Sequence, residues 1–210
     1  MTDPATAALW PGDGERTEAA RRLLLAAVDS FARRGYHATT TRDIATAAGM
    51  SPAALYIHYP SKAALLAEIS RTGHRATLEL VERAEAAGAD PVERMRALAE
   101  SFTVWHARGH TVGRIVNNEL HALPEEDFAA VAELRIRIEE TVLRIIADGA
   151  AAGLFRVPDQ RTAARAVTSL GIDVSRWYTE RSSESPEELG RRYGQLVLRM
   201  LGAPDARIGD

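Results

Sequence analysis

Apolar residues recur at three- and four-residue steps along most of this 210-residue chain, the spacing of amphipathic helices. In the first such stretch, residues 15–35, the apolar face consists of Ala20, Leu24, Val28 and Phe31. Gly35 follows the last of these residues, as a glycine that ends a helix does. No segment alternates at period two for long enough to predict a strand, so the pattern predicts an all-α protein.

Three further helices are predicted close behind the first. The threonines at 39–41 are good N-caps for a second helix, which Gly49 ends after about two turns. Ser51 caps a third helix, and Ser61 caps a fourth that continues to residue 87. Two short helices joined by a glycine-containing turn, after a longer packing helix, predict a helix-turn-helix.

The remainder of the chain is also helical in pattern. Further helices are predicted near residues 90–109, 111–122, 125–152, 159–180 and 186–202. The predicted organisation is a disordered arm, a helix-turn-helix domain, a larger helical domain and a tail, at residues 1–14, 15–62, 63–204 and 205–210.

Composition excludes several classes of protein. The chain has no cysteine, which rules out disulfides, thiolate nucleophiles and cysteine-ligated zinc. No apolar run approaches the roughly 20 residues that a bilayer crossing needs, and no export signal is visible, so we expect a cytoplasmic protein without a membrane partner. Residues 1–62 carry a more positive charge balance than the remainder, as a small nucleic-acid-binding domain would.

The segment SPAALYIHYPSK, residues 51–62, contains the only lysine of the chain. Leu55 and Tyr59 lie four residues apart and should face the core together. Lys62 begins a helix, where a cation is unfavourable for the helix dipole, so a DNA phosphate is the expected partner. The alternative is that the rings only fill a small core and that Lys62 is a solvated charge.

Three spaced motifs surround this segment: GYHATTTRDIA from Gly35, AG at 48–49, and LYIHYPSKAAL from Leu55. With them the chain resembles the DNA-binding domain of the TetR/AcrR transcriptional regulators, without a gap from about Leu23 to Ile69. The resemblance implies DNA contacts from Thr41, Arg42, Ser51, Pro52, Ala53, Ala54, Tyr56, Ile57, His58 and Lys62.

Two positions depart from the usual pattern of that family. Ile57 stands where an aromatic or basic contact residue is common, and Pro52-Ala53 replaces a commoner polar-glycine pair. Few hydrogen-bonding side chains are then left on the face that reads DNA. Base recognition is therefore expected to depend on apolar contact, on Arg42 and on DNA shape.

The resemblance also implies a homodimer that forms through the last two helices and releases a palindromic operator when a small molecule enters the C-terminal domain. Apolar stripes on those helices supply the expected dimer interface: Ala166, Leu170, Val174, Leu189, Tyr193, Leu196 and Met200. The alternative is that these stripes only bury the core of their own chain.

A set of rings with a few polar groups suggests a pocket for a largely apolar effector. The candidate residues are Phe102, Trp105, His106, His110, Asn118, His121, Phe155, Ile172, Trp177 and Tyr178. The segments WHARGHTVGRIVNNELHAL, SLGIDVSRWY and SPEELGRRYGQLVLRML are similar to a branch of the family that regulates fatty-acid and steroid catabolism. That similarity makes an acyl-CoA thioester a candidate effector, although core packing would also explain most of these residues.

Two other classes of protein remain open. His106 and His110 are four residues apart and could ligate a metal in a helical enzyme, yet no HExxH, phosphate-binding glycine loop or serine elbow is present. A helical interaction module without DNA binding is the second class. We expect a DNA-binding transcriptional repressor, not an enzyme, with no cofactor.

Overall fold

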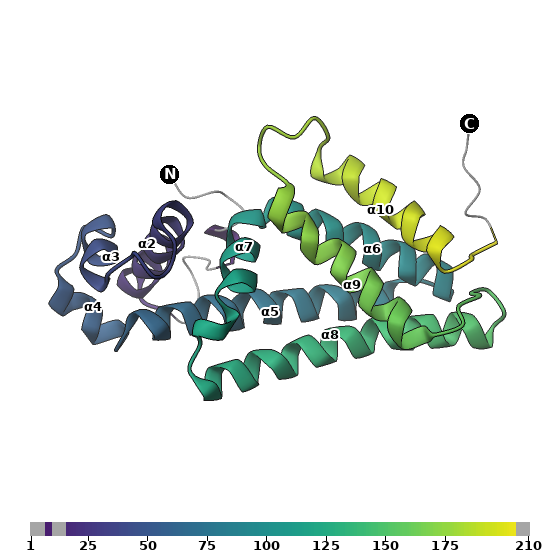
Figure 1. Cartoon of the computed structure of the whole chain (residues 1–210), viewed down its shortest axis with the longest axis horizontal. Coiled ribbons are helices and arrows are strands. Elements are labelled where there is room, and N and C mark those ends of the chain that lie inside the picture. The colour runs from purple at the N-terminus through teal and green to yellow at the C-terminus, as the bar shows by residue number, and fades with distance from the viewer. Residues whose placement is uncertain (1–6, 10–15, 205–210) are drawn as a thin grey trace. The chain divides into compact units, whose positions relative to one another are not determined.

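The structure is a computed structural model that describes residues 7–9 and 16–204 (Figure 1). The predicted tail, residues 205–210, lies outside the described residues, as does the predicted arm, residues 1–14, except for 7–9. Every regular element in the described ranges is a helix, which confirms the all-α class. Of the helices in this part of the chain, none combines the length and apolar character that crossing a bilayer requires.

The first helices begin at the caps that the sequence predicts. They are α2 (Glu18–Arg34), α3 (Thr41–Ala47), α4 (Pro52–His58) and α5 (Lys62–Ala87). Thr40 caps α3 in a reciprocal arrangement with Asp43, and the Ser51 hydroxyl accepts a hydrogen bond from the Ala54 amide at the start of α4. Side-chain caps of this kind satisfy amides that have no partner within the helix.

The later helices are α6 (Pro91–Arg108), α7 (His110–Asn118), the 3-10 turn η1 (Leu120–Ala122), α8 (Glu125–Ala151), α9 (Gln160–Trp177) and α10 (Pro186–Met200). The prediction of one helix at 111–122 was wrong in its second half, where the α-helix stops at Asn118 and a 3-10 turn follows. A 3-10 turn after the end of an α-helix is common, because the tighter turn satisfies otherwise unpaired carbonyls.

The chain forms two compact units, each made of two separate segments. Among the described residues, the first unit comprises those up to His74 together with 111–132, and the second comprises 75–110 and those from Glu133 to 204. Lys62, where the sequence analysis placed a domain border, is the first residue of α5, and the first unit continues beyond it to His74. The helix-turn-helix therefore belongs to a unit that is discontinuous in sequence.

The core of the first unit draws on both of its segments. Its fully buried large side chains come from α2 to α5: Leu23, Leu24, Ile44, Leu55, Leu65, Leu66 and Ile69. The returning segment adds Val112, Ile115, Val116, Leu123 and Val131 to the same cluster. A three-helix domain of about 60 residues buries a comparatively small fraction of its surface, so these added side chains enlarge a core that would otherwise be small.

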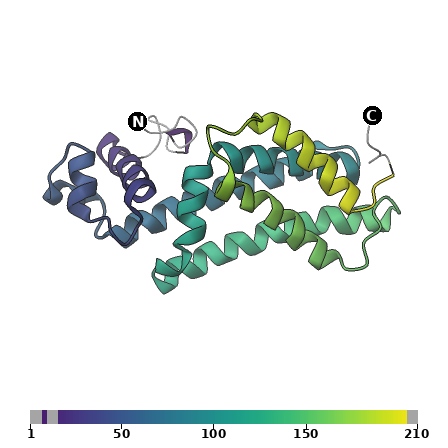
Figure 2. The ribbon, with the colours of Figure 1, turned by 45° about the horizontal axis from the view of Figure 1, so that its top comes forward.

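In the second unit, α6 packs against both α9 and α10 (Figures 1 and 2). Glycines allow these helices to approach closely. A Cβ atom added at Gly171 of α9 would lie 2.3 Å from Cδ1 of Phe102, and one at Gly190 of α10 would lie 2.9 Å from the carbonyl oxygen of Glu100. The α6 side of these contacts occupies the space that a side chain would need.

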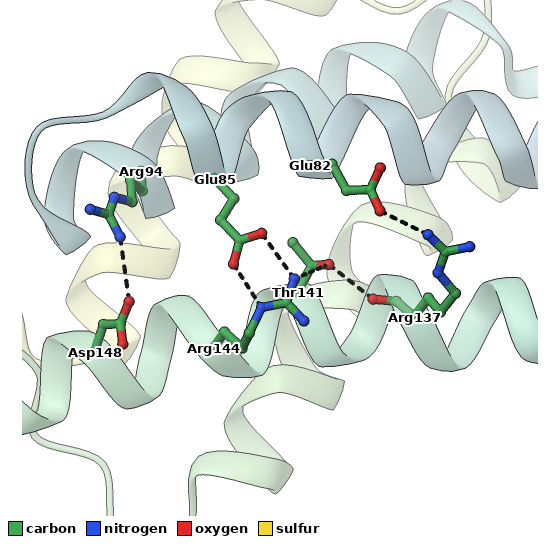
Figure 3. A network of polar contacts seen from close by, with 7 residues as sticks. All are labelled: Glu82, Glu85, Arg94, Arg137, Thr141, Arg144 and Asp148. Atoms are coloured by element: carbon green, nitrogen blue, oxygen red, sulfur yellow. Dashed lines mark hydrogen bonds and ion pairs between the residues drawn. The ribbon is translucent and has the colours of Figure 1, made fainter.

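Ion pairs connect α8 to α5 and α6 along the surface of the second unit (Figure 3). Arg144 donates two hydrogen bonds of 2.9 Å to the Glu85 carboxylate, and Arg137 donates one of 3.1 Å to Glu82. Arg94 of α6 pairs with Asp148 at 3.3 Å. Because these pairs are largely exposed, each contributes little free energy, and their main effect is to favour one register of the helices.

The glycine contacts yield a test of the packing in the second unit. Gly171→Ala should lower the free energy of unfolding by about 1–3 kcal/mol, because the new methyl group overlaps the Phe102 ring. Gly73→Ala is the matched control within a helix, since its Cβ would lie 3.9 Å from Cγ1 of Val112, an ordinary contact.

Removing a helical glycine should raise stability by up to about 1 kcal/mol at position 73. Urea unfolding of the two variants measures both values. Equal stability of Gly171→Ala and the unmodified protein would mean that α6 and α9 do not pack as closely as described.

Candidate nucleic-acid interface

The turn between α2 and α3 has a defined conformation. Gly35 ends α2 with a φ of 79°, in the left-handed region that favours glycine. The buried Thr39 hydroxyl donates to the Gly35 carbonyl at 2.8 Å. The Thr40 hydroxyl and amide donate to the carboxylate of Asp43, and these bonds lower the pKa of Asp43. The first residues of α3 are thus held in one place.

Lys62 completes this turn from the start of α5. Its ammonium group donates to the carbonyls of Tyr36 at 2.7 Å, Thr39 at 2.8 Å and His37 at 3.4 Å. It also lies 4.3 Å from the centroid of the Tyr36 ring, a cation–π geometry. An ammonium has three donors, and three carbonyls receive them. Carbonyls of its own chain therefore explain a lysine at this helix start, and a phosphate is not required.

Arg22 supports the second turn, between α3 and α4. Its guanidinium donates to the carbonyl of Ala48, at the end of α3. The next residue, Gly49, has a φ of 66°, which again favours glycine. The sequence analysis did not identify Arg22, since nothing in the pattern of α2 separates it from the other arginines of that helix.

The inner face of α4 is buried as predicted. Leu55 is completely buried and Tyr59 is 9% exposed. The Tyr59 hydroxyl donates to the carbonyl of Ala20 in α2 at 3.4 Å, and burial raises the pKa of this tyrosine to about 12. These contacts determine which side of α4 faces outward.

The outer face of α4 carries exposed rings and apolar groups. Tyr56 is 54% exposed and Ile57 is 80% exposed. The Tyr56 hydroxyl lies 3.1 Å from the Thr41 hydroxyl oxygen, so the two helices are linked at their outer surface. The other residues that the family resemblance implied lie around them: Arg42, Ser51, Pro52 and Ala53 are exposed, and Ala54 and His58 are half-buried.

Two further contacts of the first unit were not anticipated from the sequence. Nε2 of His37, in the turn before α3, lies 3.5 Å from a carboxylate oxygen of Glu119, just after α7. Arg71 of α5 donates to Asp127 of α8 at 3.0 Å. Both contacts join segments far apart in the sequence, which is why no local motif reports them.

Several predicted effector residues fill the core of the second unit. The ring centroids of Phe102 and His106 lie 4.3 Å apart, and Phe155 is buried against Gly149. Trp105 donates from its indole N–H to the Thr77 hydroxyl at 2.9 Å. Ile172 is half-buried beside the same core cluster.

The remaining effector candidates are more dispersed. The rings of His110 and Tyr178 meet edge to face at 6.1 Å, whereas Trp177 is 44% exposed. Asn118 and His121 are exposed and belong to the first unit, unlike the other candidates. The structure thus groups Phe102, His106, Phe155 and Ile172 and pairs His110 with Tyr178 separately. Asn118 and His121 belong to the other unit.

A surface groove of about 660 Å³ lies elsewhere on the second unit. Its lining contains none of the predicted effector residues and consists of Glu140, Leu143, Arg144, Ala147, Pro158, Asp159, Gln160 and Arg161. The arginine at position 144 is already paired with Glu85.

The histidines considered as metal ligands both face backbone carbonyls. Nδ1 of His106 lies 2.8 Å from the Phe102 oxygen, and Nδ1 of His110 lies 3.0 Å from the Ala107 oxygen. Within the described ranges, no group of three or more histidine, aspartate or glutamate side chains is placed to hold a metal ion.

The residues expected at a dimer interface fall into three sets: buried, exposed and half-buried. Val174 is completely buried and Leu189 is 4% exposed, and both belong to a core cluster with Ala107 and Tyr178 of their own chain. Leu196 and Met200 of α10 are 41% and 37% exposed. The others, Ala166, Leu170 and Tyr193, are half-buried. Val174 and Leu189 have almost no surface left for a partner, so they are removed from the expected interface.

The geometry of Lys62 leads to a prediction that separates support of the fold from contact with DNA. Lys62→Met should lower the free energy of unfolding by about 1–2 kcal/mol, because three carbonyls lose a charged donor and the more exposed of them can turn to water.

Arg42→Met is the matched control, since Arg42 is exposed on α3, and its stability should stay within about 0.5 kcal/mol of the unmodified protein. Urea unfolding followed by circular dichroism measures both variants. If Lys62→Met proved as stable as Arg42→Met, the carbonyl contacts of Lys62 would contribute nothing to the fold.

Comparison with known families agrees with this geometry. Residues 23–69 match the family of bacterial regulatory proteins called the tetR family, and residues 88–201 match the tetracyclin repressor-like C-terminal domain. The HTH-type transcriptional repressor KstR2 of Rhodococcus jostii (strain RHA1) is 30% identical over 206 residues, which cover 97% of this chain and 99% of that protein.

Solved structures show the same relationship. A bacterial regulatory protein in the tetR family from Rhodococcus RHA1 superposes with a TM-score of 0.86 at 40% identity, covering 90% of this chain and all (100%) of that one. The fold is also that of AibR in complex with isovaleryl coenzyme A and operator DNA, with a TM-score of 0.77, 24% identity and coverage of 85% and 97%. The relatives of the present chain are regulators and not enzymes. The chain belongs to the TetR family of bacterial transcriptional regulators.

Proposed function

We propose that this protein is a cytoplasmic, ligand-responsive repressor that binds a palindromic operator as a homodimer and is released by a largely apolar effector. The observation that carries the proposal is the two-sided character of α4. Leu55 and Tyr59 anchor one side in the core, and the opposite side presents Tyr56 and Ile57 to the surroundings. A short helix anchored in this way is suited to enter the major groove.

The groups available for DNA contact divide by chemistry. Thr41 and Tyr56 carry hydroxyl groups at the outer surface of α3 and α4, where they can donate to phosphates and set the register on the duplex. Pro52 and Ala53 are small, so the backbone of α4 can approach the bases. Arg42 is the only lysine or arginine on α3 and α4, both fully described, so we expect few phosphate charges to be neutralised by each subunit.

The dimer is proposed to form around the outer surface of α9 and α10. The support is the exposure of Trp177, Leu196 and Met200, which are large apolar side chains near the ends of these two helices. Burying such side chains against their symmetry copies would remove them from water. A two-fold dimer of this kind would present two copies of α4 to an operator with matching symmetry.

An acyl-CoA thioester is the first candidate for the effector. The support is the fold shared with AibR, whose structure contains isovaleryl coenzyme A and operator DNA. In this chain the aromatic cluster around Phe102, His106 and Phe155 is the proposed region for the apolar part of the effector. These rings are packed, so binding would require some of them to move.

The proposal is tested by gel shift with DNA from upstream of the gene for this protein and of its neighbours. We expect specific binding, and release by one chain length in a series of acyl-CoA thioesters. Arg42→Ala should reduce the slope of log K against log salt by about 1 per subunit, because one phosphate contact is lost.

A control with an unrelated duplex of equal length separates specific from general binding. Equal binding to the two duplexes would contradict the proposed sequence-specific binding to an operator. An operator complex that no thioester releases would contradict only the proposed effector class.

The dimer is tested separately with exposed side chains. Leu196→Glu combined with Met200→Glu should convert the dimer into a monomer and abolish operator binding, since four buried carboxylates cannot be accommodated in an apolar interface.

Ile136→Glu is the matched control because Ile136 of α8 is 57% exposed, is apolar and lies outside the proposed interface. Light scattering coupled to gel filtration gives the mass of each variant. A dimer that persists in the double variant would place the interface elsewhere.

A further inference from the structure

Ile57 has an unusual setting for an exposed aliphatic side chain. It is 80% exposed at the penultimate position of α4, on the face opposite the buried Leu55 and Tyr59. A single exposed isoleucine is ordinary on a protein surface. Here, however, it stands on the helix proposed to enter the major groove, where a polar or charged side chain would be expected to read bases.

Two polar side chains of α4 and its cap, those of Ser51 and Tyr56, already have partners. Throughout α4 and its cap, all of which the structure describes, the Ser51 hydroxyl accepts from the Ala54 amide and the Tyr56 hydroxyl lies beside that of Thr41. Pro52 and Ala53 have no hydrogen-bonding side chain. Apart from the half-buried His58, the outer face of α4 therefore offers bases mainly apolar contact.

From this setting we propose that Ile57 is a specificity-determining residue that recognises the C5-methyl group of a thymine in each operator half-site. The inference deepens the proposed function and rests on it. The thymine methyl is the apolar group that base pairs display in the major groove, and contact with Ile57 would remove both from water.

The same contact would also reject other bases. An aliphatic side chain placed against the amino group of cytosine or the acceptor atoms of guanine displaces water without replacing its hydrogen bonds. Ile57 would thus favour thymine because it contacts the methyl group, and it would disfavour G·C pairs because their amino group and acceptor atoms would lose hydrogen bonds to water.

The expected size of the effect follows from the burial of one methyl group. Burying one such group contributes about 0.8 kcal/mol, which corresponds to about a fourfold change in dissociation constant. Two half-sites would give about a 15-fold change when both thymines lose their methyl groups.

The experiment replaces thymine by deoxyuridine, which removes the methyl group and leaves base pairing intact. An operator is first selected with the full-length protein from a library of random duplexes. Each thymine of a half-site, together with its symmetry mate, is then replaced in turn, and the dissociation constant is measured for the unmodified protein, for Ile57→Ala and for Tyr56→Phe.

We expect one symmetric pair of replacements to weaken binding by the unmodified protein about 15-fold and binding by Ile57→Ala less than about twofold. Tyr56→Phe, the matched control on the same face, should keep the full sensitivity to deoxyuridine. Because Ile57 is 80% exposed, Ile57→Ala should fold normally, which its melting temperature will check.

Two results would overturn the inference about Ile57 and leave the proposed operator binding intact. In the first, no deoxyuridine replacement weakens binding of the operator. In the second, the replacement weakens binding by Ile57→Ala as much as binding by the unmodified protein. Failure of the unmodified protein to select any sequence would instead reject the proposed operator binding and the inference with it.

Discussion

The burial of Leu65, Leu66 and Ile69 in the core of the first unit is the interaction on which the DNA-binding helices depend. The helices α3 and α4 have seven residues each, and helices of this length are not stable in water without tertiary packing. They persist because α3 and α4 pack against α2 and against each other, and their buried side chains join the same core cluster as Leu65, Leu66 and Ile69. Because Leu55 and Tyr59 on one face of α4 are buried in this core, the opposite face is the one that is exposed.

Turns, more than helices, determine how accurately that exposed face is placed. The two turns that flank α3 each receive a cationic side chain from another helix, Lys62 in the first and Arg22 in the second. The Lys62 ammonium satisfies three carbonyls of the first turn, and the Arg22 guanidinium satisfies the Ala48 carbonyl at the end of α3, which has no intrahelical partner. The same geometry requires glycine at positions 35 and 49, where φ is positive.

The helices and the buried side of α4 could be predicted because local sequence signals determine them. Caps, helix-ending glycines and three- to four-residue spacing predicted most helices to within a few residues, and the pair Leu55 and Tyr59 predicted the buried side of α4. Long-range contacts carry no such signal. The carbonyl partners of Lys62 lie 23 to 26 residues away, and the segment 111–132 joins the first core across an intervening unit.

The apolar stripes of α9 and α10 show a second limit. A stripe reveals that a helix face avoids water, and a neighbour in the same chain satisfies that need as well as a second copy does. Val174 of α9 and Leu189 of α10 turned out to cover Ala107 and Tyr178, whereas Leu196 and Met200 of α10 remain exposed. Only the packing of α6 against both helices distinguishes the two cases.

The contacts of Lys62 also bear on the chemical reactivity of the protein. This residue supplies the only side-chain amine among the 210 residues. The three donors of this ammonium all point at carbonyls, so the side chain has to leave them before its nitrogen can meet a reagent in solution. Acylating reagents directed at lysine would therefore address a single side chain, and the rate of that reaction would report how often the Lys62 ammonium leaves these carbonyls.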